Sequence, residues 1–226
     1  MSLKGKVAFF VTTNFHKFNE ARQVLAKVGV AAAMVRIEAI EIQDDNLEKI
    51  AKASVRDAVK KSRLPVLVED SGLFIRVLNG FPGPYSSHAY RTLGTKGILK
   101  LMKRITERNA YFYSVVAFYS PERASPKCFH GKVGGKITLK ERGNQGFGFD
   151  PIFMTKDEVG KTFAEMTTIE KNKFSHRAQA LRKFAVWYTS TYNKGFKYER
   201  VFALKKSTED KVCQKLKRVG PTQSDL

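Results

Sequence analysis

GFGFDPIFMTKDEVGKTFAEMTTIEKNKFSHR, residues 146–177, carries the strongest structural and chemical signals of this 226-residue chain. Gly146 and Gly148 alternate with two phenylalanines, and Asp150-Pro151 follows. Glycine lets the backbone approach a ligand closely, and proline favours an extended conformation in the residue before it. An aromatic ring beside a fixed carboxylate suits a purine, because the ring offers a stacking face and the carboxylate accepts a hydrogen bond. A Gly-rich turn with two core phenylalanines would give the same pattern.

The rest of this stretch predicts two capped helices. Thr167 and the glutamate three residues later have the spacing of a capping box. Ser175 is a candidate N-cap for a second helix, which places His176 and Arg177 in its first turn, where unpaired N–H groups attract anions. Lys171 lies just upstream. A ring, a carboxylate and a group of cations together favour a nucleotide-binding site.

Composition indicates a globular, basic protein. Hydrophobic residues make up 42% and charged residues 27% of the chain, which is ordinary for a folded domain, and the length allows one large domain or two lobes. The net charge of +20, from 41 basic and 21 acidic residues, favours polyanionic partners without saying which. Cys128 and Cys213 have no metal-ligand spacing, so a reduced, intracellular protein is expected.

No membrane segment or leader is expected from the pattern. The longest apolar run, residues 110–119, is shorter than the roughly 20 residues that span a bilayer. Residues 7–11 are too few for the apolar part of a signal peptide.

Near the N-terminus, residues 7–11 predict a strand that leads into a helix. Thr12 and Asn14 lie in the polar turn between them, with Asn14 as the expected N-cap. Lys17 falls in the first helical turn, within reach of an anion at the helix N-terminus. A capped helix with a surface lysine explains the same residues.

Acidic residues gather at positions 41–48 of this otherwise basic chain. Most of them fit the start of a helix capped by Asp45 or Asn46. Glu41 fits less well, because it precedes the cap and stands between two isoleucines.

A second acidic group follows an apolar strand predicted over residues 64–68. Glu69 and Asp70 come directly after it, and open α/β sheets place ligands at the carboxyl ends of their strands. Adjacent residues of a strand point to opposite faces, so only one of these carboxylates can easily face a site. Further elements are expected at 33–37 (strand), 73–78 (strand), 95–105 (helix capped by Thr95), 110–119 (strand) and 127–139 (strand with a bulge).

The motifs GFGFDPIF, TFAEM, EKN and SHR, in this order, resemble the inosine triphosphate pyrophosphatase family, the XTP/dITP diphosphatases, over residues 7–192. The resemblance implies hydrolysis of non-canonical purine nucleoside triphosphates to the monophosphate and pyrophosphate, with Mg²⁺ as cofactor. It implies a mixed α/β fold in which helices flank an elongated sheet and two lobes surround a deep nucleotide-binding cleft. A cytoplasmic homodimer is expected, with residues 1–193 as the pyrophosphatase domain and 194–226 as a basic extension.

The same resemblance implies roles for individual residues. Glu41 and Asp70 match magnesium ligands, and Asp70 matches the catalytic base, with Glu69 as a helper or as the alternative. The expected substrate contacts are Thr12, Asn14, Lys17 and Ser71 around the phosphates and Phe149 stacked on the purine. Asp150, His176 and Arg177 are expected around a keto group at purine position 6. Lys171, and Arg177 as the alternative to its base contact, are expected to neutralise phosphate charge. Ser54 stands where many members carry a lysine, so no phosphate contact is expected from it.

Two other readings compete with this one. A basic nucleic-acid-binding protein would use the aromatics for stacking but leaves Glu41, Glu69 and Asp70 unexplained. A related pyrophosphatase for pyrimidine or modified nucleotides would share the chemistry and differ in the base pocket. Residues 194–218 carry nine basic and three acidic residues, and at most weak, electrostatic nucleic-acid binding is expected from them. His88 is expected at the surface or a dimer contact, and His130 in a structural role.

Overall fold

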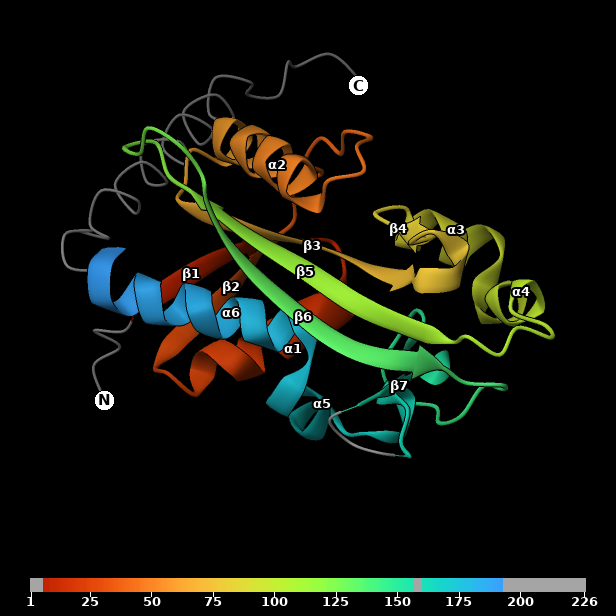
Figure 1. Ribbon diagram of the computed structural model, residues 1–226. Coiled ribbons are helices and arrows are strands. Elements are labelled where there is room, and N and C mark those ends of the chain that lie inside the picture. Colours follow the sequence, from red (N-terminus) through yellow and green to blue (C-terminus); the bar gives the residue numbers. More distant parts are fainter. Residues whose placement is uncertain (1–5, 157–159, 193–226) are drawn as a thin grey trace, which may run out of the picture.

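The computed structural model describes residues 6–156 and 160–192, which form one mixed sheet flanked by helices (Figure 1). Within these residues the sheet has seven strands in the order β2-β1-β3-β5-β6-β7, with β4 paired to β3. Strand β1 runs parallel to β2 and β3, and the other pairs are antiparallel. The strands are β1 (Lys6–Val11), β2 (Val30–Val35), β3 (Val66–Ile75), β4 (Pro82–Gly83), β5 (Asn109–Tyr119), β6 (Lys127–Ile137) and β7 (Phe153–Thr155).

The helices are α1 (Phe15–Ala26), α2 (Leu47–Ser62), α3 (Ser86–Thr92), α4 (Gly94–Leu101), α5 (Thr168–Phe174) and α6 (His176–Trp187). Short 3-10 turns cover Arg76–Leu78, Asp150–Ile152 and Phe163–Glu165, and a π turn covers Tyr188–Tyr192.

Helices α2 and α6 cover opposite faces of the sheet because side chains alternate along β5. Val116 and Phe118 pack in the core that α6 and α1 share with β1. Val115 and Ala117 pack in a second core beneath α2. Hydrophobic burial on both faces is the main favourable contribution to such a fold.

Strand β6 lies unusually close to α6 at Gly131. A Cβ atom at this position would lie 1.9 Å from the carbonyl oxygen of His176. Glycine therefore lets the first turn of α6 rest directly on the sheet. This contact fixes His176 and Arg177 relative to β5 and β6.

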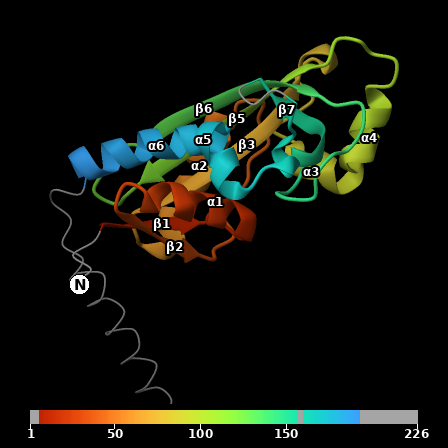
Figure 2. The ribbon, with the colours of Figure 1, turned by 90° about the horizontal axis from the view of Figure 1, so that it is seen from below.

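Strands β3, β5 and β6 extend beyond α2 into a second lobe that contains α3, α4 and β7 (Figures 1 and 2). This lobe has its own core, built around Leu73, Ile98, Phe112, Phe153 and Phe163. The predicted mixed α/β fold with an elongated sheet is confirmed, and the separate cores agree with two lobes.

The predicted helix starts agree with the structure where a side-chain cap was recognised. Asn14 accepts a hydrogen bond from the backbone of Lys17, and Asn46 caps α2. Thr167 forms a capping box with Glu170 at α5. Ser175 accepts from the backbone of Ala178 at α6.

Several predicted boundaries were wrong. The strands expected at 64–68 and 73–78 are one continuous strand, β3, so Glu69 and Asp70 lie inside a strand and not after it. Residues 76–78 form a 3-10 turn. Strand β2 begins at Val30, three residues before the expected start.

A helix forms where one was predicted at 95–105, but its predicted end and its Thr95 cap were wrong, as was the bulge in the strand at 127–139. Helix α4 ends at Leu101, and no side chain caps it. Strand β6 pairs with β5 in unbroken register from Lys127 to Lys136. Residues 80–87 include β4 and the first residues of α3.

None of the helices in the described part of the chain is long and apolar enough to cross a membrane. The predicted extension, 194–226, lies outside the described residues, and the boundary at 193 stays a prediction.

Candidate active site

A cleft of about 1260 Å³ lies between the lobes. Its walls come from the β1–α1 turn, α2, the middle of β3, α3, the 146–150 loop and the start of α6. Every site residue predicted from the sequence lines this cleft: Thr12, Asn14, Lys17, Glu41, Glu69, Asp70, Ser71, Phe149, Asp150, Lys171, His176 and Arg177.

The N-terminus of α1 forms one end of the cleft. Thr12 Oγ1 accepts a hydrogen bond from Asn14 N at 3.1 Å, and Asn14 Oδ1 accepts from Lys17 N at 3.1 Å. The Lys17 ammonium donates to the backbone carbonyl of Glu69 at 3.0 Å. Lys17 is partly exposed, so its charge faces both the cleft and the sheet.

Glu69 is buried on the α1–α6 side of β3. Its carboxylate accepts from Ser114 Oγ at 2.7 Å and lies 3.0 Å from Lys17 Nζ and 3.2 Å from Arg177 Nε. Burial alone would raise the pKa of Glu69, but the Arg177 and Lys17 cations outweigh it and hold that pKa well below its usual range. Glu69 therefore stays ionised, and its charge is committed to these partners.

Asp70 points to the other face and has a different environment. Burial, together with the nearby Glu69 and Glu41 carboxylates, raises the pKa of Asp70 to about 6, although Lys17 acts in the opposite direction. Its Oδ2 atom is buried and finds no hydrogen-bond partner among the described residues.

These carboxylates fit a hard cation. Hard cations prefer oxygen ligands, and Mg²⁺ commonly takes one or two carboxylates and completes its shell with water and substrate phosphates. Asp70 supplies a buried, unpartnered oxygen, and Glu41 is exposed to the cleft nearby. Within the described ranges no three His, Cys, Asp or Glu side chains form a complete metal site. The protein thus offers a partial site.

The segment that carries Glu41 is held by α2. Ile40 donates its backbone N–H to Asp57 Oδ2 at 2.9 Å, and its carbonyl accepts from Ser54 Oγ at 2.8 Å. Ser54 is buried and occupied by this bond. Its hydroxyl therefore positions the strand-like segment before Glu41.

A buried ion-pair cluster joins Glu20 of α1 to Asp150, Lys171 and Arg177, and the last three line the cleft. Lys171 Nζ lies 2.8 Å from Glu20 Oε1 and 2.6 Å from Asp150 Oδ2. Arg177 donates to Glu20 Oε2 at 2.5 Å and to Ser71 Oγ at 3.0 Å. Sequence reasoning missed Glu20, whose only signal is an acidic residue within the apolar stripe of α1.

The charges of this cluster are fixed by mutual compensation. Burial opposes ionisation of Glu20, but Lys171 and Arg177 lower the pKa of Glu20 to about 2. Burial raises the pKa of Asp150. Lys171 was expected to neutralise phosphate, yet it is 2% exposed and its ammonium is paired with the Glu20 and Asp150 carboxylates.

Asp150 holds the 146–150 loop. Its Oδ2 accepts the backbone N–H of Phe147 at 2.9 Å. Gly146 has φ 74°, and a Cβ atom there would lie 2.2 Å from Asp150 Oδ2. The glycine is therefore needed for the carboxylate to reach the loop backbone.

The two phenylalanines of the loop differ in exposure. Phe149, the predicted stacking residue, is 3% exposed and packs edge-on against Tyr90 in the core of the second lobe. Phe147 is half-buried and lines the cleft. Lys171 Nζ and Arg177 Cζ lie 5.1 and 5.3 Å from its ring centroid. The geometry favours Phe147 over Phe149 as the stacking surface.

His176 is buried between aromatic rings. Its imidazole stacks on Phe112 at 4.6 Å and on Phe163 at 6.4 Å. Burial, reinforced by the Arg177 cation, lowers the pKa of His176 well below its usual value. Its Nδ1 atom is buried without a hydrogen-bond partner within residues 6–156 and 160–192, so the ring is neutral with an unused polar atom at the cleft.

Two further histidines, His88 and His130, agree with their predicted surface and structural roles as far as the structure describes them, and His88 also lines the cleft. His88 is exposed on α3. His130 Nδ1 lies 2.8 Å from the Tyr113 hydroxyl, and its Nε2 lies 3.3 Å from Glu48.

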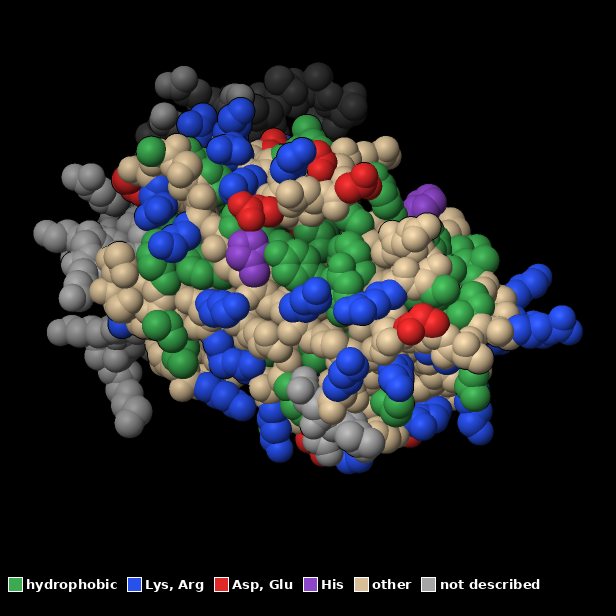
Figure 3. Space-filling model, viewed as in Figure 1, with side chains coloured by type: hydrophobic (Ala, Val, Ile, Leu, Met, Phe, Trp, Pro, Cys, Tyr) green, Lys and Arg blue, Asp and Glu red, His purple; other side chains and the backbone are tan. Residues whose placement is uncertain are grey.

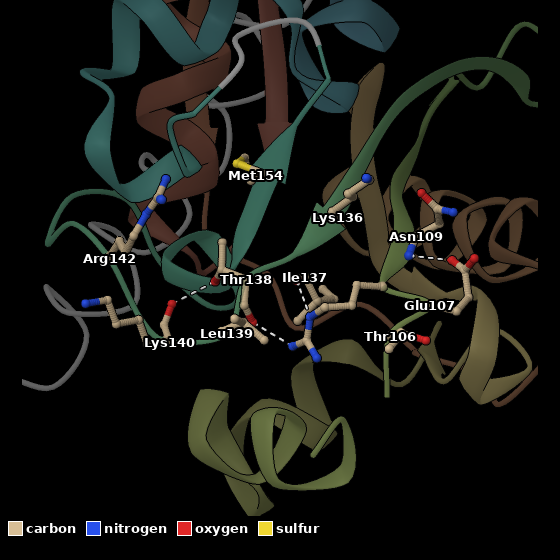
Figure 4. Close-up of a pocket in the computed structure, with 11 residues that line it drawn as sticks. Thr106, Glu107, Asn109, Lys136, Ile137, Thr138, Leu139, Lys140, Arg142 and Met154 are labelled. Atoms are coloured by element: carbon tan, nitrogen blue, oxygen red, sulfur yellow. Dashed lines mark hydrogen bonds between the residues drawn. The ribbon is translucent and has the colours of Figure 1, made fainter. Parts of the chain in front are cut away.

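A second pocket, of about 510 Å³, lies at the far ends of β5 and β6 (Figure 4). Arg108 is a half-buried cation of this pocket, but its guanidinium donates to the carbonyls of Ile137, Met102, Ile105 and Thr138 at 2.6–3.3 Å. The pocket contains none of the predicted site residues. We therefore place the candidate chemistry in the larger cleft.

The fold and cleft define an α/β nucleotide-binding class, with an anion site at a helix N-terminus, a carboxylate pair and a cationic aromatic pocket. The chain belongs to the Ham1 family, whose model matches residues 8–187. The family resemblance predicted from the sequence is thereby confirmed.

Relatives of known sequence and structure agree. The dITP/XTP pyrophosphatase of Methanopyrus kandleri is 46% identical over 179 residues, which are 79% of this chain and 94% of that protein. The dITP/XTP pyrophosphatase of Saccharolobus solfataricus is 44% identical over 190 residues, 84% of this chain and 97% of that protein. A solved HAM1 protein from Coxiella burnetii has a TM-score of 0.72 and 29% identity, and the match covers 82% of this chain and all of that one.

Proposed function

We propose that this protein hydrolyses non-canonical purine nucleoside triphosphates, ITP, dITP and XTP, to the monophosphate and pyrophosphate. The observation that carries the proposal is one cleft that brings together a helix start with Lys17, the Asp70–Glu41 carboxylates, and the Phe147 ring with its cations. A basic nucleic-acid-binding protein does not need this arrangement.

The N-terminus of α1 is the proposed binding site for the triphosphate. The unpaired N–H groups of α1 and the Lys17 ammonium attract the triphosphate. Glu69 fixes Lys17 through a buried ion pair, so the cation is positioned before substrate arrives, and such preorganisation favours transition-state charge. Glu69 thus acts on Lys17 and Arg177, and we assign it no proton transfer.

Asp70 is the residue that we assign to the reaction itself. With Glu41 it would hold Mg²⁺, which when bound neutralises phosphate charge and lowers the cost of activating water. The unpartnered Asp70 oxygen can also orient or accept a proton from the attacking water.

The base end is rich in donors and poor in free acceptors. Both buried carboxylates, Glu20 and Asp150, are engaged by Lys171 or Arg177. A keto oxygen at purine position 6 finds donors there, whereas a 6-amino group finds no unengaged carboxylate. A site built for one hydrogen-bonding group rejects the wrong one strongly, so ITP and XTP are preferred over ATP, and Phe147 provides the stacking face.

The decisive experiment is a pyrophosphate-release panel with ITP, XTP, dITP, ATP, GTP and the pyrimidine triphosphates, each with Mg²⁺ and with EDTA. We expect kcat/KM for ITP and XTP to exceed that for ATP by about 10²-fold or more, and EDTA to abolish release. Equal kcat/KM for ATP and ITP would reject the proposed specificity. Full activity in EDTA would reject the metal.

The proposal includes a cytoplasmic homodimer. The family resemblance supports it, as does the ring cluster of Phe74, Tyr111 and Tyr113 on the sheet face beside α2, where Figure 3 shows apolar side chains at the surface. Light scattering after size-exclusion chromatography tests it: a mass near 51 kDa, twice the 25.6 kDa chain, is expected, and a mass of one chain would reject it.

A further inference from the structure

His16, in the first turn of α1, stacks on the Phe147 ring. The two ring centroids are 5.2 Å apart and the ring planes differ by 18°. Both residues line the cleft, although they come from opposite ends of the site in sequence. His16 is exposed, whereas Phe147 is half-buried.

The buried side of Phe147 is already occupied. Lys171 and Arg177 lie within 5.3 Å of its ring centroid, and both are 2% exposed. Their ion pairs with Glu20 and Asp150 fix them there, and Asp150 also ties down the Phe147 backbone. Because the cations are buried and the imidazole is exposed, the ring face that looks into the cleft is the one that His16 covers.

The His16 side chain is free to leave this position. Across the described ranges its imidazole makes no hydrogen bond or ion pair, and its ring contact with Phe147 is its one recorded side-chain interaction. The backbone around it is fixed, because Asn14 caps the turn and Lys17 is paired with Glu69. Rotation of the side chain alone therefore uncovers the ring without disturbing the phosphate end.

We propose that His16 is a removable cover of the base-stacking surface, which competes with the purine for the same face of Phe147. The proposal rests on the proposed function, in which Phe147 is the stacking surface for the base. Base–aromatic stacking is stronger than a single exposed ring pair, so the purine displaces the imidazole. Every base-containing ligand then binds more weakly than it would to an uncovered ring, by the same factor for each purine.

The test is calorimetric titration of His16→Ala with inosine monophosphate and, separately, with inorganic tripolyphosphate, which has no base. We expect His16→Ala to lower the Kd of inosine monophosphate by about 3- to 10-fold, the range of a lost aromatic pair, and to leave tripolyphosphate binding within about 2-fold. Phe15→Ala is the matched control, because Phe15 is the preceding exposed ring of the same turn and does not line the cleft. Its Kd values should equal those of the wild type.

Two further variants separate a cover from a merely structural residue. His16→Phe keeps a ring over Phe147, so its Kd for inosine monophosphate should be no lower than that of the wild type. In a Phe147→Ala background, His16→Ala should bring no gain, because the shared surface is gone.

A higher or unchanged Kd of His16→Ala for inosine monophosphate would overturn the proposal, and a higher value would show that His16 contacts the base directly. The same protein, assayed for pyrophosphate release from ITP, distinguishes the two failures. If the wild type hydrolyses ITP but His16→Ala does not bind inosine monophosphate more tightly, only the covering role of His16 is rejected. If the wild type does not hydrolyse ITP, the proposed function is rejected.

Discussion

Glu69 and Asp70 are adjacent on β3, so their carboxylates point to opposite faces of the sheet and lie in different environments. Glu69 faces α1 and α6, where three polar partners fix its charge. Asp70 faces the cleft, where burial raises its pKa and one oxygen lacks a partner within the described structure. One residue is thus suited to hold cations in place and the other to take part in the reaction.

This difference gives the first prediction. Asp70→Asn should lower kcat by about 10² or more, the usual contribution of a general base, while the melting temperature stays near that of the wild type. Glu69→Gln, in contrast, should lower the melting temperature, because it leaves Arg177 and Lys17 without a buried counter-charge. Steady-state kinetics and thermal denaturation of both variants check this. A fully active, folded Asp70→Asn would move the role to Glu69.

Phe147 lines the cleft and Phe149 is buried, so their truncation should affect substrate binding and stability differently. Phe147→Ala should raise KM for ITP and XTP by a similar factor, about 10-fold or more, with little change in stability. Phe149→Ala should cost about 3–5 kcal/mol in the free energy of unfolding, as other buried Phe truncations do. Urea denaturation and kinetics on both variants test the assignment. If Phe149→Ala folds normally and alone raises KM, the original prediction for Phe149 is right.

Glu20 gives a pH-dependent prediction. Its pKa falls from an ordinary value near 4.5 to about 2 in the folded protein, so its ionised form stabilises the fold above about pH 4.5, and this stabilisation is lost as the pH falls towards 2. Glu20→Gln should therefore be less stable than the wild type by about 3–5 kcal/mol at neutral pH.

The difference between Glu20→Gln and the wild type should shrink between about pH 4.5 and 2. Denaturation curves across this range check it. A stability difference that does not change with pH would show that the Glu20 charge has no such role. Glu122→Gln is a suitable control, because Glu122 is exposed and takes no part in the buried cluster.

At the residue scale, the sequence predicted which residues line the cleft. It did not predict the ion pairs that these residues form or which of them are buried. The predicted site residues all line the cleft. Glu20 was missed because it lies 151 positions from Lys171, and only the folded chain pairs them. Phe149 was assigned the stacking role from the family resemblance, which does not reveal which of the two rings the core of the second lobe buries.

At the scale of elements, local signals succeeded and pairing signals failed. Asn14, Asn46, Thr167 and Ser175 cap the helices that were predicted from them, since a cap depends only on neighbours in sequence. The acidic, glycine-containing stretch at 69–72 was read as a break between strands. Strand β3 continues through it because β5 pairs with it along its full length, from Val66 opposite Tyr119 to Ile75 opposite Ala110.

Helix α2 positions Glu41 through Ser54 and Asp57, which bind both backbone polar groups of Ile40. Ser54→Ala should raise the Mg²⁺ concentration needed for half-maximal activity by about 10-fold, as for other residues that orient a metal ligand. Ser62→Ala is the matched control, because Ser62 bonds only within the end of α2 and its Leu64 neighbour. Activity measured against Mg²⁺ concentration tests this. Identical activity curves for Ser54→Ala and Ser62→Ala would show that the Ser54 hydroxyl does not position a metal ligand.

For the whole molecule, the net charge is +20. Figure 3 shows Lys and Arg side chains across the face that carries α2 and the long strands. A strong positive field attracts anionic substrates and polyanions alike, so charge alone did not select between enzyme and nucleic-acid-binding protein. The carboxylates in the cleft are the feature that favours the enzyme.

The basic extension separates the two classes experimentally. Residues 194–218 carry a net charge of +6 and lie outside the described residues, whereas every residue assigned to the cleft lies at or before Arg177. A chain ending at Tyr192 should therefore keep most of its kcat and its preference for ITP over ATP. Pyrophosphate-release assays on the truncated and full-length chains measure this.

Nucleic-acid binding provides the opposing measurement. Full-length protein should bind single strands weakly, with log K falling by about 0.7 for each phosphate contacted as log salt rises, and truncation should flatten this slope without changing hydrolysis. Fluorescence anisotropy over a salt series reports it. Tight binding at physiological salt, combined with no pyrophosphate release from any triphosphate, would replace the enzyme with a nucleic-acid-binding protein. We expect the reverse, because a phosphate backbone has no use for the buried Glu69 charge or for the unpartnered Asp70 oxygen that the cleft presents.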